Sequence, residues 1–353
     1  MQLATGAKWT GTIRENALLS EFLEDEIWVR NDRSNAFNYQ ENVPAAYLSL
    51  GQKIGEKTYV EAGLRAEFTN LLRTDRLVED VIEQRYLDWL PNLYLSHDLN
   101  DENSLALNYS KRLSRPPFFR INNNVLKITD FRFELGNPDL TPEYIHRVAL
   151  DFNQKNQRFS IYLRRTVDAI NGIYLLEGET AFYKPFNAGA QTNVGLSYNR
   201  YGNLTKWWYL KGSGGIFQRK FTNDEGIDSF EQLTYYFRLN NIFKLNATSS
   251  FELNARYNSR YADAFYISEQ NFTIDMILQK SFFDKRLNCK IYVNDVFNIL
   301  EYANSRPFDT FESRRIIKPQ TRTVRLWVTY NFSNKNKLNK RTNQSKNEAR
   351  RRL

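Results

Sequence analysis

This 353-residue chain has few side chains of the types that form catalytic or metal-binding sites. The chain has two histidines, His97 and His146, and one cysteine, Cys289. A single cysteine can form neither an intramolecular disulfide nor a cysteine-rich metal site. The sequence also lacks a Gly-x-Ser-x-Gly elbow, a phosphate-binding Walker loop, a His-Glu-x-x-His pair and a dinucleotide fingerprint. We therefore expect no enzyme activity, no cofactor and no metal site.

Charged and aromatic side chains gather instead in residues 113–142, which also hold four of the nine prolines. Prolines interrupt helices and ladders, so this stretch is predicted to be a long loop. Its mixture of charge and aromatic surface could contact a solute. The candidate contacts are Arg115, Phe118, Phe119, Arg120, Arg132 and Glu134. Other acids and bases fall on the polar faces of predicted strands, where a membrane barrel normally carries charge, so we do not combine them into an active site.

The last apolar stretch, residues 323–332, shows the type of element that would position such a loop. Its even-numbered positions form an apolar face, and its odd-numbered positions are mostly polar. The apolar face comprises Val324, Leu326, Val328, Tyr330 and Phe332. A period of two predicts a strand with two unlike faces. A ten-residue strand of this kind is typical of a membrane β-barrel, although a soluble sandwich could contain it too.

The pattern repeats along the chain and predicts fourteen strands, all in a single β-domain, residues 1–332. The expected strands cover residues 2–14, 36–51, 59–71, 86–99, 104–112, 144–152, 158–175, 190–201, 206–220, 228–242, 248–257, 265–282, 286–297 and 323–332. Between the first two, residues 17–22 could form a short helix. Connections after odd-numbered strands are long, and those after even-numbered strands have about three to six residues. This alternation favours an antiparallel transmembrane outer-membrane β-barrel over a sandwich.

Composition agrees with strands that are polar on one face. Aromatic residues make up 15% of the chain, mean hydropathy is negative, and no apolar run reaches the length of a membrane helix. We expect the short turns to face the periplasm and the long loops to face the exterior. Tyr109 and Tyr257 would then lie in the outer aromatic girdle, and Tyr330 and Phe332 at the periplasmic interface.

The net charge of +9 is concentrated in the last residues, 333–353. This tail has eight Lys or Arg against one acid, which leaves +2 for residues 1–332. A nearly neutral main body argues against nucleic-acid binding. We expect a disordered, solvated periplasmic tail, with contact to anionic lipid or another envelope component as the alternative. The expected partners are outer-membrane lipid and the barrel-assembly machinery.

Three motifs carry a family resemblance. They are Tyr-Ser-Lys-Arg-Leu-Ser-Arg-Pro at 109–116, Gly-Asn-Pro-Asp-Leu-Thr-Pro-Glu at 136–143 and Asn-Asp-Val-Phe-Asn at 294–298. With the aromatic final strand, they resemble the C-terminal barrel region of TonB-dependent receptors, and especially the Bacteroidota-type outer membrane β-barrel family. The second motif is the most specific. Gly136 and Asn137 supply a turn and two prolines fix the backbone, so we expect the motif to shape a loop rather than touch a ligand.

The resemblance implies energised uptake of a substrate, with the TonB system and possible surface-lipoprotein partners. Such receptors carry a signal peptide, a TonB-contacting box, a plug and a barrel of twenty-two strands, whereas this sequence shows fourteen strands and no visible signal peptide. We therefore expect a truncated receptor whose remaining strands lie elsewhere. A self-contained fourteen-stranded channel and an adhesin or assembly barrel stay open as alternatives.

Overall fold

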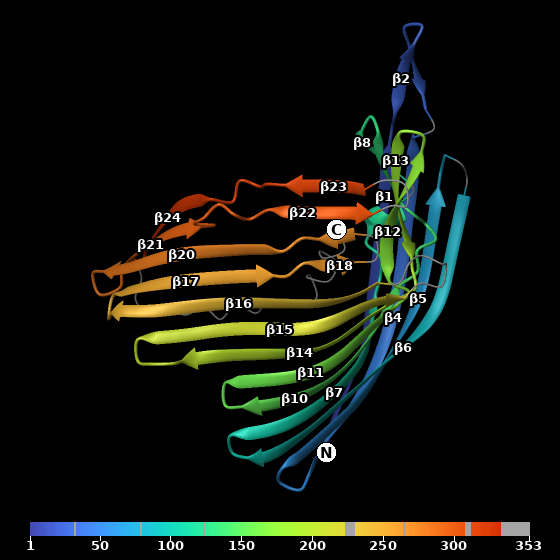
Figure 1. The fold of residues 1–353 in the computed structure, drawn as a ribbon. Helices are drawn as coiled ribbons and strands as arrows, with labels where there is room; N and C mark the ends of the chain where they lie inside the picture. Colours follow the sequence, from blue (N-terminus) through green and yellow to red (C-terminus); the bar gives the residue numbers. More distant parts are fainter. Residues whose placement is uncertain are drawn as a thin grey trace.

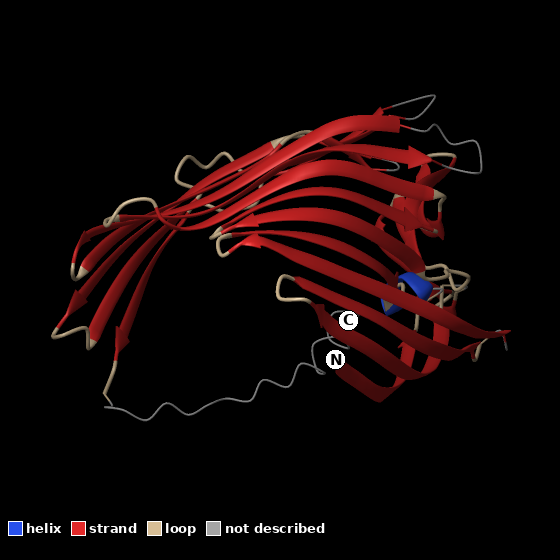
Figure 2. Cartoon of the chain, turned by 90° about the horizontal axis from the view of Figure 1, so that it is seen from below, coloured by secondary structure: helices blue, strands red, loops and turns tan. Residues whose placement is uncertain are grey.

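The computed structural model describes residues 1–332 except residues 32, 78–79, 123, 223–229, 264–265 and 308–311. The predicted basic tail, 333–353, lies outside the described residues. Fourteen strands form one antiparallel sheet in chain order, so the all-β prediction is confirmed. Figure 2 shows this sheet curved across its width into an open trough. Its strands are β1 (Gln2–Leu18), β4 (Asn35–Ile54), β5 (Thr58–Asp75), β6 (Asp80–Asn100), β7 (Asn103–Ser114), β10 (Glu143–Gln154), β11 (Gln157–Val167), β14 (Ala190–Asn203), β15 (Trp208–Thr222), β16 (Phe230–Asn246), β17 (Ser249–Asn258), β20 (Asn271–Phe282), β21 (Leu287–Asn294) and β24 (Thr323–Tyr330).

The remaining elements lie in the long connections, mostly as small sheets. Figure 1 shows the tight turns along one end of the large sheet and most of these small elements towards the other. They are β2 (Glu21–Glu24), β3 (Ile27–Arg30), α1 (Phe118–Ile121), β8 (Val125–Thr129), β9 (Arg132–Leu135), β12 (Ile170–Glu177), β13 (Thr180–Asn187), β18 (Tyr261–Asp263), β19 (Tyr266–Ser268), β22 (Tyr302–Pro307) and β23 (Glu312–Ile317). Within the described ranges, no helix is long and apolar enough to cross a membrane.

Several expected boundaries are wrong. The short helix predicted at 17–22 is absent, because β1 continues to Leu18 and β2 begins at Glu21. The strand predicted at 158–175 breaks where Asp168 adopts a left-handed φ of 53°, and β12 then pairs with β13 outside the large sheet. The strand predicted at 265–282 is divided into β19 and β20, and residue 265 lies outside the described ranges. The predicted loop 113–142 contains α1, β8 and β9.

The two faces of the large sheet differ in chemistry. On β5, Glu61, Arg65 and Glu67 share one face, and Val60 and Leu64 are among the residues on the other. We call the first the inner face, because residues 115–142 fold against it, and the second the outer face. The outer face is apolar and exposed: Trp9 is 69% exposed and Leu326 is 68% exposed. Large apolar surface that is left uncovered over a whole sheet suits lipid rather than water.

The two edges of the sheet are β1 and β24. In the described residues, no ladder joins them to each other. On β24, Val324, Leu326 and Val328 lie opposite Val293, Ile291 and Cys289, so the apolar face predicted for 323–332 continues the outer face of β21. The strand itself ends at Tyr330, two residues earlier than predicted.

Candidate functional site

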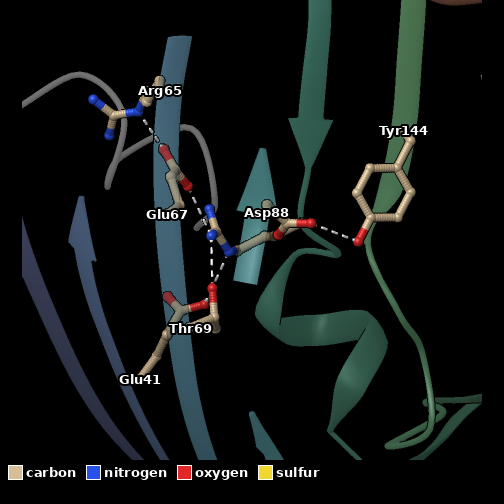
Figure 3. Close-up of polar contacts among 7 residues, drawn as sticks. Glu41, Arg65, Glu67, Thr69, Asp88 and Tyr144 are labelled. Atoms are coloured by element: carbon tan, nitrogen blue, oxygen red, sulfur yellow. Dashed lines mark hydrogen bonds and ion pairs between the residues drawn. The ribbon is translucent and has the colours of Figure 1, made fainter. Parts of the chain in front are cut away.

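An ion network on the inner face holds the connection 115–142 to the sheet. Arg115 donates to the Glu67 carboxylate (Nη2 to Oε2, 2.8 Å) and to the Thr69 hydroxyl (2.8 Å), and its Nε lies 3.6 Å from Glu41 Oε1. Arg65 donates to the second oxygen of Glu67 at 2.6 Å. Figure 3 shows these acids on adjacent strands. Glu41 is 1% exposed and Thr69 is 0% exposed, so this end of the network is buried, whereas the side chain of Arg65 is 29% exposed.

A second polar contact lies beside this network. Tyr144, at the start of β10, donates its hydroxyl to Asp88 Oδ1 at 2.9 Å (Figure 3). Asp88 is buried on β6, and it lies directly opposite Glu67 in the β5–β6 ladder. The inner face of β4 to β6 therefore collects buried acids, to which Arg115 of the connection and Tyr144 of β10 bring hydrogen-bond donors.

Apolar packing completes the attachment of the connection. Ile121 and Leu140 form a buried cluster with Phe37, Tyr39 and Leu71 of the inner face. The ring of Phe118 packs against this cluster, with centroids 6.0 Å from Phe37 and 5.8 Å from Tyr39. The two ends of the connection are therefore packed on the inner face, whereas β8 and β9 between them join β12 and β13 in a separate small sheet.

The Gly-Asn-Pro motif fixes the return of the connection into β10. A Cβ at Gly136 would lie 1.4 Å from the carbonyl oxygen of Asn122, so only glycine permits this approach of two backbone segments. Asn137 donates its backbone N–H to the Arg120 carbonyl at 2.6 Å and its side chain to the Pro185 carbonyl at 2.9 Å. Its amide oxygen accepts the backbone N–H of Asp139 at 3.0 Å. The motif joins three segments, as a loop-shaping role requires.

A cavity of about 520 Å³ lies between the connection and the sheet edge. Its charged lining combines four cations with two acids, and Tyr39 and Phe118 add aromatic surface. The charged residues are Lys8, Arg14, Arg65, Arg115, Glu41 and Glu67. Arg14 lies over the Phe118 ring, 5.4 Å from its centroid. The side chains that line it could hold a polar solute with an aromatic part.

A larger cavity, about 670 Å³, lies on the inner face of β14 to β20. Four cations, Arg200, Lys211, Arg238 and Arg256, line this cavity, with Asp275 as the one acid. Lys211, Arg238 and Arg256 are at inner-face positions of their strands, whereas Arg200 is at an outer-face position of β14. Arg238 and Arg256 lie opposite one another in the β16–β17 ladder, and this pairing is unfavourable because the two positive charges repel. Arg256 reaches Asp275 at 3.1 Å, which relieves part of that repulsion.

The Asn-Asp-Val-Phe-Asn motif caps β21. Asp295 accepts the Thr321 hydroxyl at 2.5 Å and the backbone N–H groups of Ile299 (3.0 Å) and Leu300 (3.2 Å). Burial alone would raise the pKa of the Asp295 carboxyl, but these three hydrogen bonds outweigh it and hold the pKa below its usual value. The motif thus fixes the connection between β21 and β24.

The six candidate ligand contacts lie in different environments and do not form one cluster. Arg115 is bound in the ion network and Phe118 packs in the apolar cluster; both also line the 520 Å³ cavity. Phe119 is 63% exposed, and Arg120 lies over its ring at 5.9 Å. Arg132 donates to Glu134 at 2.6 Å on β9. Ligand contact by these residues stays a prediction.

The girdle tyrosines both lie on the outer face. Tyr109 approaches His146 Nδ1 with its hydroxyl at 3.2 Å, and Tyr257 stacks on Tyr235 and Phe237 with centroids 5.7 and 5.5 Å away. Tyr330 packs against Phe332 at 4.7 Å. The depth of these residues in a membrane stays a prediction.

The sequence reasoning missed most of the residues that line the two cavities. Lys211, Arg238 and Arg256 come from three strands, and Glu41 comes from a fourth. Each stands at a polar position of an alternating strand, which gives its face but not its neighbours across the sheet. Among the described residues, no group of three or more His, Cys, Asp or Glu could hold a metal ion.

Two solved structures with a similar fold are receptors. The siderophore receptor PiuA from Acinetobacter baumannii aligns with a TM-score of 0.67 at 11% identity, over 93% of this chain and 53% of the receptor. The ferric yersiniabactin uptake receptor FyuA from Yersinia pestis aligns with a TM-score of 0.62 at 14% identity, over 91% of this chain and 50% of the receptor. At these identities the likeness shows the fold alone. The chain spans about half the length of the receptors it matches.

No curated protein sequence matches the chain. The family model described as the outer membrane protein beta-barrel family, however, matches residues 1–332, which include all fourteen strands of the large sheet. With its exposed apolar outer face and its charged inner face, the chain belongs to the outer membrane protein beta-barrel family.

Proposed function

We propose that this protein is the barrel portion of a receptor that takes up a solute across the outer membrane. The observation that carries the proposal is the division of the curved sheet into an apolar outer face and a charged inner face with two cavities. An apolar outer face suits lipid, and a polar inner face suits the passage of a hydrated solute. The fold likeness to siderophore receptors supports transport over catalysis.

The proposal includes the parts that the resemblance implies. Strands outside this chain complete a barrel of the Bacteroidota type, a plug fills it, and the TonB system drives uptake, with a surface lipoprotein as a possible partner. The short turns lie in the periplasm, where the tail 333–353 also lies, and the long connections face the exterior. The barrel-assembly machinery inserts the protein. The coverage of about half of each solved receptor supports this completion.

Uptake is tested with cells that produce the protein and are offered ferric siderophores or copper, the cargoes named for the structural neighbours. The natural protein should raise accumulation of at least one probe, and a protonophore should abolish the increase. Arg256→Gln, in the 670 Å³ cavity, should reduce accumulation at equal surface level, whereas the exposed Arg85→Gln should not. If every probe accumulated equally with and without the protein, ferric siderophores and copper would be excluded as its substrates.

Completion by other strands is tested by cross-linking with a short thiol-reactive reagent. Cys289 lies opposite Val328 in the β21–β24 ladder, so Val328→Cys should cross-link to it as a positive control. Pairs that place one cysteine on β1, such as Ala7→Cys, and one at successive positions of β24 are then compared after Cys289→Ser. Closure of the chain on itself would give efficient cross-links between β1 and β24 in one register. The proposal expects none.

A further inference from the structure

An apolar groove runs across the outer face of β11, β14 and β15. Its volume is about 350 Å³. The ladders place Leu196 opposite both Ile161 and Ile216, and they place Tyr198 opposite both Phe159 and Gly214. These pairs share the outer face, and the side chains that line the groove come from all three strands. The rings of Phe159 and Tyr198 pack at 4.6 Å and form one wall.

Glycines at the bottom of this groove leave space that a side chain would otherwise fill. Gly212 and Gly214 occupy successive outer-face positions of β15. A Cβ at Gly214 would lie 3.3 Å from the Tyr236 carbonyl oxygen, which is a tight contact but not an overlap. The inner-face Gly215 differs, because a Cβ there would lie 2.8 Å from the Tyr236 ring. Packing within the sheet therefore restricts position 214 less than position 215, and the missing side chain at Gly214 leaves the groove open.

A cation, Arg200, lies on the outer face just beyond the residues that line the groove. Arg200 follows Tyr198 on the same face of β14, about 7 Å along the strand. Across the ladders it faces Gln157 and Gly212. In the described part of the chain it has no acidic partner, and its buried Nε has no hydrogen-bond partner. Gln157 is already engaged, since its amide oxygen accepts the Tyr198 hydroxyl at 2.6 Å.

The position of Arg200 suits the boundary between lipid tails and headgroups. It lies three residues before the end of β14, and the short turn that follows contains Trp207. Trp207 stacks on Trp208 with centroids 6.1 Å apart, and such aromatic clusters are typical of the membrane interface. An arginine on a lipid-facing surface is stabilised when its guanidinium reaches an anionic headgroup there.

We propose that this groove and Arg200 form a binding site for one glycerophospholipid of the periplasmic leaflet. An acyl chain fills the groove over Gly214, and the lipid phosphate accepts hydrogen bonds from the Arg200 guanidinium. The apolar lining matches the acyl chain of such a lipid, and the cation at one end matches its phosphate. A free anion would match only the cation. The inference rests on the membrane placement in the proposed function, but it is independent of solute uptake.

The test is native mass spectrometry of the full protein, extracted from outer membranes in mild detergent and titrated with phosphatidylglycerol. Loss of a charge-assisted hydrogen bond should weaken binding about tenfold, so Arg200→Gln should raise the titration midpoint by about that factor. Gly214→Leu fills the groove and should have a similar effect, whereas Arg200→Lys should stay within about threefold of the natural protein.

Two variants serve as matched controls. Arg165→Gln removes an outer-face arginine near the opposite end of β11, and Ala255→Leu adds bulk to the outer face of β17, away from the groove. Both should bind phosphatidylglycerol like the natural protein. Heat-modifiable migration of every variant shows that the barrel is folded, so a loss of lipid cannot be mistaken for a loss of structure.

The proposal is overturned if Arg200→Gln and Gly214→Leu bind the lipid like the natural protein, or lose it no more than the two controls do. It is also overturned if inorganic phosphate alone displaces the lipid completely, because the groove would then contribute nothing. Solute uptake that persists in both variants leaves the proposed function intact, and a barrel that binds the lipid without transporting any probe separates the two conclusions.

Discussion

Replacing Arg115 by methionine should detach the connection 115–142 from the inner face. The change keeps most of the apolar stem of Arg115, but it leaves Glu41 without its 3.6 Å ion pair and removes the 2.8 Å contacts to Glu67 and Thr69. Glu67 keeps its ion pair with Arg65 at 2.6 Å, and Glu41, which is 1% exposed, loses its ion pair with Arg115. Breaking a buried ion pair from one side costs about 3–5 kcal/mol.

Hydrogen–deuterium exchange of peptides from residues 115–142 measures this local opening. A loss of about 3–5 kcal/mol in local stability should accelerate exchange by about two to four orders of magnitude. The Asn137 amide, which donates to the Arg120 carbonyl at 2.6 Å, should report it clearly. Peptides from β16 and β17, which lie elsewhere in the sheet, should exchange as before.

Arg85→Met is the matched control, because Arg85 pairs with Glu83 on the surface, where the two side chains are 62% and 46% exposed. Such pairs contribute about 0–1 kcal/mol. Adding Glu41→Gln to Arg115→Met should recover part of the protection, since it removes the buried negative charge that Arg115 no longer balances. If Arg115→Met exchanged no faster in this connection than Arg85→Met, the ion network would not be what holds the connection.

Three further predictions concern the turns and the two faces. Gly136→Ala should expose the connection to trypsin, because its Cβ would lie 1.4 Å from the Asn122 carbonyl oxygen. The control is Gly55→Ala, whose Cβ would have no atom within 4 Å. It should cost about 1 kcal/mol or less for its φ of +65° and leave the cleavage pattern unchanged. Because the pKa of Asp295 is lowered in the native state, its ionised carboxylate stabilises that state at pH values above the ordinary carboxyl pKa of about 4. This stabilisation is lost as the pH falls through the native-state pKa, so the unfolding midpoint of Asp295→Asn should fall less in acid than that of the natural protein. Parallel pH profiles of the two unfolding midpoints would contradict the assignment. Trp9→Arg places a charge on the outer face and should destabilise the barrel in liposomes by about 2–4 kcal/mol, whereas Thr10→Arg on the inner face should be nearly neutral; equal effects would refute the assignment of faces.

The strands and their faces could be predicted because their signal is local. Val60, Leu64 and Phe68 alternate with Glu61, Arg65 and Glu67, and the pleat of a strand converts that order directly into two faces. The count of fourteen strands follows from repeating this reading between turns. The break at Asp168 could not be predicted in the same way, because the residues after it remain apolar and only their pairing partner changes.

The candidate site could be predicted only in part. Residues 113–142 carry visible charge and aromatic side chains, but nothing local shows that they pack inward. That outcome depends on Phe37, Tyr39 and Leu71, which precede the connection by more than forty residues in the sequence. The cationic cavity has the same limitation, because Lys211, Arg238 and Arg256 meet through the register of β15, β16 and β17. The sequence predicts Gly136 as a turn residue, but glycine is required there because the Asn122 carbonyl lies where a Cβ would be.

The free edges of the sheet decide how the barrel must be completed. β1 is 17 residues long, and about half of its backbone N–H and C=O groups point away from β4. In lipid each unpaired group costs several kcal/mol, so an open β1 would cost more than the roughly 5–15 kcal/mol that stabilises a typical domain. The edge must therefore be paired in the membrane, either with β24 or with further strands. The trough is open between β1 and β24, and these fourteen strands span about half of each matched receptor, which favours further strands. The cysteine pairs proposed above distinguish the two, because closure on β24 requires a β1–β24 register that cross-linking would detect.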